Sequence, residues 1–241
     1  MNRKKNNRFI PGIYNYCDRW CERCAFTERC SIFAVKVAEA MCEGDLDAAM
    51  ELAIGRPQPV EGEHQPTIGE RLLTELGDLS VSDKEMEEYR KVENARRARL
   101  ERDPLSRMVQ TYTDRAADWL KDHRERLSTP ADPMVREALD VIGWDVWLVG
   151  AKIHRALHGR DESRTGEMPD DHPVQNDWNG SAKVALISLA RSESAWRAIA
   201  QAAPDERASV FADGLGHLRR ALERDFPDAM AFVRPGFDEG C

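Results

Sequence analysis

Four of the six cysteines in this 241-residue chain lie within fourteen residues of one another, close to the N-terminus. They are Cys17, Cys21, Cys24 and Cys30, with the spacing C-x3-C-x2-C-x5-C. A Cys-x-x-Cys pair turns two thiolates toward one ion, and flanking cysteines can complete a set of four ligands. Because 41% of the chain is hydrophobic, a core can form without disulfides. We therefore predict that these four cysteines bind a metal.

The compact arrangement of the cysteines favours an iron–sulfur cluster, with zinc as the alternative. Structural zinc sites more often join two Cys-x-x-Cys pairs across a long loop, whereas this segment holds one such pair and all four cysteines in a single loop. Single-loop ligation is common for cubane 4Fe-4S clusters. Nearby arginines would offset the thiolate charge and aromatic residues would shield the site: Arg19, Arg23, Arg29, Tyr14, Tyr16, Trp20, Phe26 and Phe33.

Parts of this spacing resemble two families of iron–sulfur proteins. The last three cysteines, C-x2-C-x5-C, resemble the iron–sulfur loop of endonuclease III and the adenine mismatch glycosylases over about ten residues. Three residues separate the first two cysteines here, whereas six separate them in that family, and no helix-hairpin-helix glycine motif is visible. We therefore do not predict glycosylase activity. The first three cysteines match the spacing of radical-SAM enzymes. Those enzymes need a β/α barrel and leave one iron of the cluster free to bind the cofactor. This chain instead shows no strand pattern and offers Cys30 as a fourth ligand.

The net charge of the chain and its first residues indicate which partners and which cellular compartment to expect. The formal charge of −8 argues against broad nucleic-acid binding, because phosphates attract a basic surface. Pro11 and Gly12 interrupt any signal-peptide core after the basic stretch from Met1 to Arg8. No apolar run approaches the ~20 residues that span a bilayer. We expect a cytoplasmic protein without a membrane segment, whose clustered cysteines ligate a metal rather than form disulfides.

Helix signals dominate the first half of the chain beyond the cysteines. Short helices are predicted over 31–43 and 45–54, the second capped by Asp45, and a Gly/Pro-rich loop over 55–66. Two capping boxes predict further helix starts: Thr67 with Glu70, and Ser82 with Glu85. The charged stretch 81–102 predicts a solvated helix. Its terminal arginines suit the helix dipole without a partner: Arg96, Arg97, Arg99 and Arg102.

Four long helical patterns follow. They start at Asp103-Pro104, at Asp132-Pro133, at Asn179 or Ser181, and at Pro204, and the last ends before Pro227. The second is expected to end near His158 and the third near Ala203, with a long Pro-, Gly- and Asp-rich connection over 159–180 between them. The third carries small residues along one side, which let two helix backbones approach: Ser181, Ala185, Ser188, Ser192 and Ala195.

These patterns predict an all-α fold: a four-helix bundle preceded by short helices and an N-terminal four-cysteine metal-binding segment. The expected divisions are a metal-binding segment over 1–34, short helices and the charged helix over 35–102, the bundle over 103–227 and a C-terminal tail over 228–241.

The second long helix has two distinctive faces. Its apolar stripe is the expected core face: Val135, Ala138, Leu139, Ile142, Val146, Val149, Ile153 and Leu157. The opposite face carries Asp140, Trp144, Trp147, His154 and His158. Two tryptophans, together with two histidines one turn apart, are unusual on a solvated face. They predict a cofactor-binding pocket or an interface with another helix.

Two functions are compatible with these features. The first is a metal-binding protein with a structural, redox or sensing role, whose helices offer a surface to a protein or small-molecule partner that the sequence does not identify. The alternative is an enzyme with its active site among the bundle helices around His154 and His158. The sequence contains no nucleophile–base pair, phosphate loop or dinucleotide motif. No catalytic residue is therefore assigned.

Overall fold

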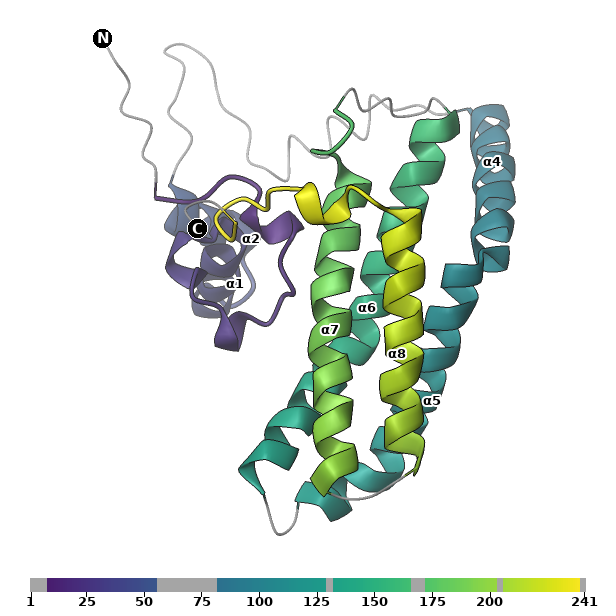
Figure 1. The fold of residues 1–241 in the computed structure, drawn as a ribbon. Helices are drawn as coiled ribbons and strands as arrows, with labels where there is room; N and C mark the ends of the chain where they lie inside the picture. Colours follow the sequence, from purple (N-terminus) through teal and green to yellow (C-terminus); the bar gives the residue numbers. More distant parts are fainter. Residues whose placement is uncertain (1–7, 56–81, 129–131, 166–171, 203–205, 239–241) are drawn as a thin grey trace, which may run out of the picture. The chain divides into compact units, whose positions relative to one another are not determined.

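The computed structural model describes residues 8–55, 82–128, 132–165, 172–202 and 206–238 (Figure 1). Within these residues the chain forms α-helices and short 3-10 turns and no β-strand, which confirms the predicted all-α class. Contacts divide the chain into two units. We name residues 1–93 with 235–241 the cysteine unit, and residues 94–234 the helical unit.

The cysteine unit begins with three 3-10 turns, η1 (Ile13–Asn15), η2 (Cys21–Arg23) and η3 (Thr27–Arg29). The helices α1 (Ser31–Met41) and α2 (Leu46–Ile54) follow, close to their predicted positions. As expected, Asp45 caps α2: its Oδ1 accepts a hydrogen bond of 3.0 Å from the Ala48 backbone N–H. The two helices meet through a small core of Ala38, Ala49 and Ala53.

The residues predicted to form a C-terminal tail, 228–241, divide between the two units as far as they are described. The turn η4 (Ala229–Ala231) belongs to the helical unit, where Lys183 Nζ donates to the Phe232 carbonyl oxygen at 2.6 Å. Residues 235–238 instead pack in the cysteine unit, with Gly236 against Ile10 and Ile13. The segment is divided because its apolar residues pack in two different places.

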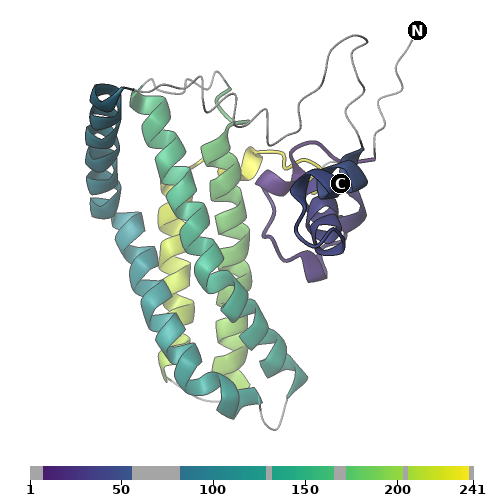
Figure 2. The same ribbon diagram turned by 180° about the vertical axis from the view of Figure 1, so that it is seen from behind.

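The helical unit holds the end of α4 (Asp83–Arg102) and the long helices α5 (Pro104–Ser128), α6 (Pro133–Thr165), α7 (Asp177–Ala202) and α8 (Glu206–Asp225). The two views in Figures 1 and 2 show these four long helices side by side. Contacts run from α5 to α6, from α6 to α7 and from α7 to α8, with a smaller contact between α5 and α8. The predicted apolar stripe of α6 is buried throughout its length.

Two helix boundaries differ from the prediction. Helix α6 does not end near Gly159 but continues to Thr165. Gly159 packs as a helical residue beside Trp178, whose Cβ would lie 3.7 Å from a Cβ added to the glycine. Helix α7 begins at Asp177, ahead of both predicted caps, and Asn176 supplies the cap: its Oδ1 accepts from the Asn179 N–H at 2.9 Å. The predicted loop over 55–66, apart from Gly55, and the capping box of Thr67 and Glu70 lie outside the described residues.

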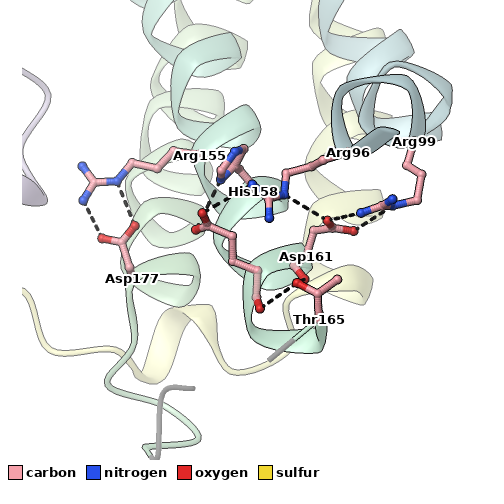
Figure 3. Close-up of polar contacts among 8 residues, drawn as sticks. Arg96, Arg99, Arg155, His158, Asp161, Thr165 and Asp177 are labelled. Atoms are coloured by element: carbon pink, nitrogen blue, oxygen red, sulfur yellow. Dashed lines mark hydrogen bonds and ion pairs between the residues drawn. The ribbon is translucent and has the colours of Figure 1, made fainter. Parts of the chain in front are cut away.

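The capping box at the start of α4 is confirmed, since Ser82 Oγ donates to a Glu85 carboxylate oxygen at 2.7 Å. The end of α4 is not solvated as predicted. Arg96 is only 3% exposed, and its Nε lies 3.3 Å from an Asp161 oxygen of α6 (Figure 3). Arg99 Nη2 approaches the same carboxylate at 2.7 Å. The end of α4 is thus bound to the C-terminal extension of α6, in which Glu162 also faces Arg96 at 3.6 Å.

The two arginines in this contact change the pKa of Asp161. The hydrogen bond from Arg99, assisted by that from Arg96, lowers the pKa of Asp161 below its ordinary value despite partial burial of the carboxyl. A carboxylate with a lowered folded pKa stabilises the fold above its unfolded pKa, which is about 3.9. That stabilisation is lost as the pH falls through the folded value.

We expect Arg96→Gln to lower the free energy of unfolding by about 2–3 kcal/mol at pH 7, because the substitution removes the buried positive charge that pairs with two carboxylates. Arg97→Gln is the matched control, since Arg97 is exposed and pairs along its own helix with Glu101. Urea unfolding at several pH values measures both. The difference in the free energy of unfolding between Arg96→Gln and wild type should become smaller below about pH 4. Equal stability of the two variants at pH 7 would contradict the role of this contact.

Candidate metal centre

The four cysteines line one small cavity of the cysteine unit. Its volume is about 20 Å³, and its wall includes Cys17, Cys21, Cys24, Cys30 and the aromatic residues Tyr14, Trp20, Phe26, Phe33 and Phe237. A space of this size admits about one water-sized sphere. All four thiols are half-buried, and none of them is in a disulfide. The spacing in the sequence therefore becomes a shared, mostly apolar cavity in the fold.

The 3-10 turns explain how the thiols reach the same cavity. The N–H of Cys24 donates to the Cys21 carbonyl oxygen at 3.2 Å, which closes η2. The N–H of Cys30 closes η3 in the same way on Thr27, also at 3.2 Å. Because a 3-10 helix has three residues per turn, side chains three apart lie on one side of it. Cys21 and Cys24 consequently face the cavity together.

The backbone between the first two cysteines is strained. Arg19 has a φ of 60°, a left-handed conformation that non-glycine residues rarely adopt. Its neighbours hold it there: Asp18 Oδ1 accepts from the Trp20 N–H at 3.1 Å, and the Cys21 N–H donates to the Arg19 carbonyl oxygen at 3.0 Å. Such strain persists only where surrounding contacts impose it, and it is concentrated at functional sites.

Burial and neighbouring sulfurs affect the protonation of one thiol in the cavity. Burial raises the pKa of the Cys21 thiol, and the neighbouring Cys17 sulfur raises it further, whereas Lys36 acts in the opposite direction. A thiolate at Cys21 is therefore disfavoured until a positive centre compensates it. One sulfur already has a donor, since the Phe26 N–H points at Cys24 Sγ at 3.4 Å. Arg23, expected near the thiolates, stacks over Trp20 at 3.9 Å.

The donor set fits the predicted group chemically. Four thiols in one loop are the ligands of a 4Fe-4S cluster and are also accepted by zinc. Asp18 is the one carboxylate among the described residues that line the cavity, and it is engaged by the Trp20 N–H. Within the described part of the chain, however, no group of three or more His, Cys, Asp or Glu side chains is arranged so that it could hold a metal ion as it stands. Ligation by all four cysteines stays a prediction.

The C-terminal end of the chain completes the cavity wall. Phe237 packs edge-on against Phe26, with ring centroids 5.0 Å apart and an interplanar angle of 74°. Gly236 makes this approach possible, because it has a φ of 76° and an added Cβ would lie 2.8 Å from Ile10 Cδ1. No local pattern in the sequence indicated this contact. The one signal was an isolated Pro-Gly-Phe in a polar tail.

The second predicted site lies on a more open surface. Trp147 is 64% exposed and His154 is exposed, whereas Trp144 and His158 are half-buried. These four residues, predicted to bind a cofactor, line neither the cysteine cavity nor the larger cavity between α5 and α8. His158 Nδ1 lies 3.3 Å from a Glu162 oxygen, beside the contact between α4 and α6 (Figure 3). Cofactor binding there stays a prediction.

Neighbouring ion pairs explain part of this arrangement. Arg155 follows His154 in α6, and its Nε donates to Asp177 at 2.9 Å (Figure 3). Arg160, on the next turn, pairs with Asp225 of α8 at 3.1 Å and stacks over Phe226 at 4.5 Å. The C-terminal half of α6 is thus an attachment surface, bound by charged residues to α4, to the start of α7 and to the end of α8.

Comparison of the chain with protein-family models, with curated proteins and with solved structures gave no match. Among the described helices, none has the length and apolar character needed to cross a membrane. The 33 residues of α6 are long enough, but charged residues such as Asp140, Asp145 and Lys152 recur along it.

We expect Gly236→Ala to open the cysteine unit. The added methyl group would overlap buried Ile10 and Ile13 and would also force alanine into a left-handed conformation. Gly44→Ala is the matched control, because Gly44 has a φ of 91° but no atom within 4 Å of an added Cβ. Gly236→Ala should cost about 1–3 kcal/mol more than Gly44→Ala. Amide hydrogen exchange over residues 8–55 measures the effect, and equal protection in both variants would contradict the contact.

Proposed function

We propose that this protein is a metal-binding protein in which an N-terminal four-cysteine segment, joined to a four-helix bundle, holds an iron–sulfur cluster, with zinc as the alternative. The observation that carries the proposal is the common cavity of Cys17, Cys21, Cys24 and Cys30, none of them in a disulfide. Four thiols that share a cavity without bonding to one another can serve as the ligands of one metal group once they are deprotonated.

The aromatic wall would shield the bound group, cluster or zinc, from solvent. Solvent exposure and hydrogen bonds to sulfur tune iron–sulfur clusters, and a hydrophobic shell restricts the access of solvent to them. Here aromatic rings surround the thiols and the Phe26 N–H points at Cys24 Sγ. Ligation from one compact loop, with a single Cys-x-x-Cys pair, favours the cluster.

A structural role is supported by the small core of the cysteine unit. Its buried hydrophobic residues, among those described, are Ile10, Ile13, Ala38, Ala49 and Ala53. Three alanines and two isoleucines bury little apolar surface, and a segment the length of residues 8–55 with so small a core is usually stabilised by disulfides or metals. Since metal binding is then coupled to folding, the bound group would supply much of the stability of the unit. Redox or sensing activity would come in addition to this role.

The alternative of an enzyme centred on His154 and His158 gains no support from the placement of these residues. His154 is exposed, and His158 faces Glu162 in an ion-pair network rather than a described cavity. We therefore do not propose a reaction for this surface.

We expect the protein, purified without oxygen, to carry iron and sulfide and to show broad absorbance near ~400 nm. Cys24→Ser should abolish the absorbance and the bound iron, because the proposal makes Cys24 a ligand. Cys42→Ser is the control, since Cys42 packs against the alanine core and does not line the cavity. Elemental analysis separates the alternatives: one zinc in a colourless protein supports zinc, and a protein free of both metals contradicts the proposal.

Metal removal should act on one unit only. Chelation under reducing conditions is expected to abolish amide protection over residues 8–55, because the alanine core cannot hold this unit alone. Protection of α5–α8 should be unchanged, because that unit has its own large core. Hydrogen exchange followed by mass spectrometry reads both units in one sample. Full protection of residues 8–55 after complete metal removal would argue against the structural role.

A further inference from the structure

A second, larger cavity lies between α5 and α8. Its volume is about 650 Å³, within the range of roughly 300–1,000 Å³ typical of small-molecule sites. Its apolar lining comes from Met108, Tyr112, Trp119, Val210, Phe211 and Leu218. The contact between α5 and α8 is the smallest among the neighbouring long helices, which leaves this space between them. Val210 is 63% exposed at its edge, so the cavity is an open groove.

The floor of this groove is held rigidly by aromatic contacts. Trp196 of α7 is fully buried and stacks on Phe211 with ring centroids 4.4 Å apart. It also meets Trp119 edge-on at 4.8 Å. The Trp196 Nε1–H donates to the Tyr112 hydroxyl at 3.1 Å, and burial raises the pKa of Tyr112, which keeps that hydroxyl neutral. The floor is therefore a preorganised apolar surface.

The rim of the groove is polar and its charges are unevenly distributed. Arg207, near the start of α8, contacts the His123 ring nitrogen of α5 at 3.0 Å. The start of α8 therefore lies beside the end of α5, and the two helices are antiparallel (Figure 1). Asp118 and Asp122 accordingly share the end of the groove that holds Arg207.

Two further arginines line the groove toward its other end. Arg107 lies near the start of α5, and Arg115 lies at the middle of α5, one helical turn before Asp118. His217 of α8 also lines the groove. The His217 Nδ1 lies 2.8 Å from the Asp213 carbonyl oxygen, which must accept, so Nδ1 carries a hydrogen. Among the described residues, neither arginine side chain has an ion-pair or hydrogen-bond partner. Two exposed arginines without acidic partners beside an apolar floor are free to receive an anion.

We propose that this groove binds a small amphipathic anion, with an apolar or aromatic body on the Trp119–Phe211 floor and a single acidic head group at Arg107 and Arg115. Charge complementarity selects this occupant over a neutral one, because the lining carries three arginines and two aspartates. The site is independent of the cysteine unit, and all its residues belong to the helical unit.

Gly214 provides a direct way to test the groove. It lines the cavity, and an added Cβ would meet no atom within 4 Å. Gly214→Leu should therefore fill the groove without disturbing the packing, and replacing a helical glycine by leucine favours the helix. An unchanged or raised Tm would show that the variant is folded. Arg107→Gln with Arg115→Gln removes the anion contacts, and Arg136→Gln on α6, which does not line the groove, is the matched charge control.

The experiment titrates the full-length protein with 8-anilinonaphthalene-1-sulfonate, an aromatic body with one sulfonate, and follows its fluorescence. Wild type should bind at one saturable site from which decanoate, but not decan-1-ol, displaces the probe. Gly214→Leu and the double arginine variant should each weaken binding by about tenfold or more, a change of about 1.4 kcal/mol. Arg136→Gln should bind as wild type does.

Three results would overturn the proposal. Binding of the probe to Gly214→Leu with wild-type affinity would place the ligand outside the groove. Displacement by decan-1-ol as effective as that by decanoate would remove the anionic requirement. A wild-type dimer that excludes the probe, and that Gly214→Leu converts to a monomer, would show that a second copy of the chain fills the groove.

Discussion

The close approach of α6 and α7 is the contact on which the helical unit depends. Small residues along α7, among them Ser188 and Ser192, are buried and let the two backbones come together. Asp145 of α6 is fully buried in this interface, with Arg191 Nε donating to it at 2.9 Å and Ser192 Oγ at 3.0 Å. A buried carboxylate without such partners would be strongly destabilising. The hydrogen bonds to Asp145 therefore fix how α6 and α7 are aligned, and the other helices pack onto this pair.

The cysteine unit is stabilised in a different way. Its alanine core buries little surface, and its loop contains a strained residue, Arg19. Residues 235–238 compensate by packing against Ile10 and Ile13, and the metal that we propose would join the four thiols. The first contact joins segments that are distant in the sequence, and the metal would join separate turns of one loop. This difference explains why we place a structural metal in one unit and a ligand groove in the other, where a large core already exists.

The two candidate sites were accessible to sequence reasoning to very different degrees. Thiol ligands clustered in a short loop leave a local pattern, so Cys17 to Cys30 could be named as a group and the structure places them around one cavity. The groove between α5 and α8 has no such pattern. Its floor combines Tyr112 and Trp119, which look like ordinary core positions of one helix, with Phe211 of another. Conversely, the face of Trp147 and His154 looked distinctive along the helix, yet these two residues are exposed in the structure.

By itself the sequence determined what depends on neighbours along the chain: the helical class, the capping of α2 by Asp45, the capping of α4 by Ser82 and the buried stripe of α6. Hydrogen bonds and periodicity within one or two turns decide these features. Only the tertiary structure decided that Arg96 is buried against Asp161, that Phe237 closes the cysteine cavity and that α5 and α8 leave a groove. Each of these depends on which distant segments meet, and charge or apolarity at a single position does not specify its partner.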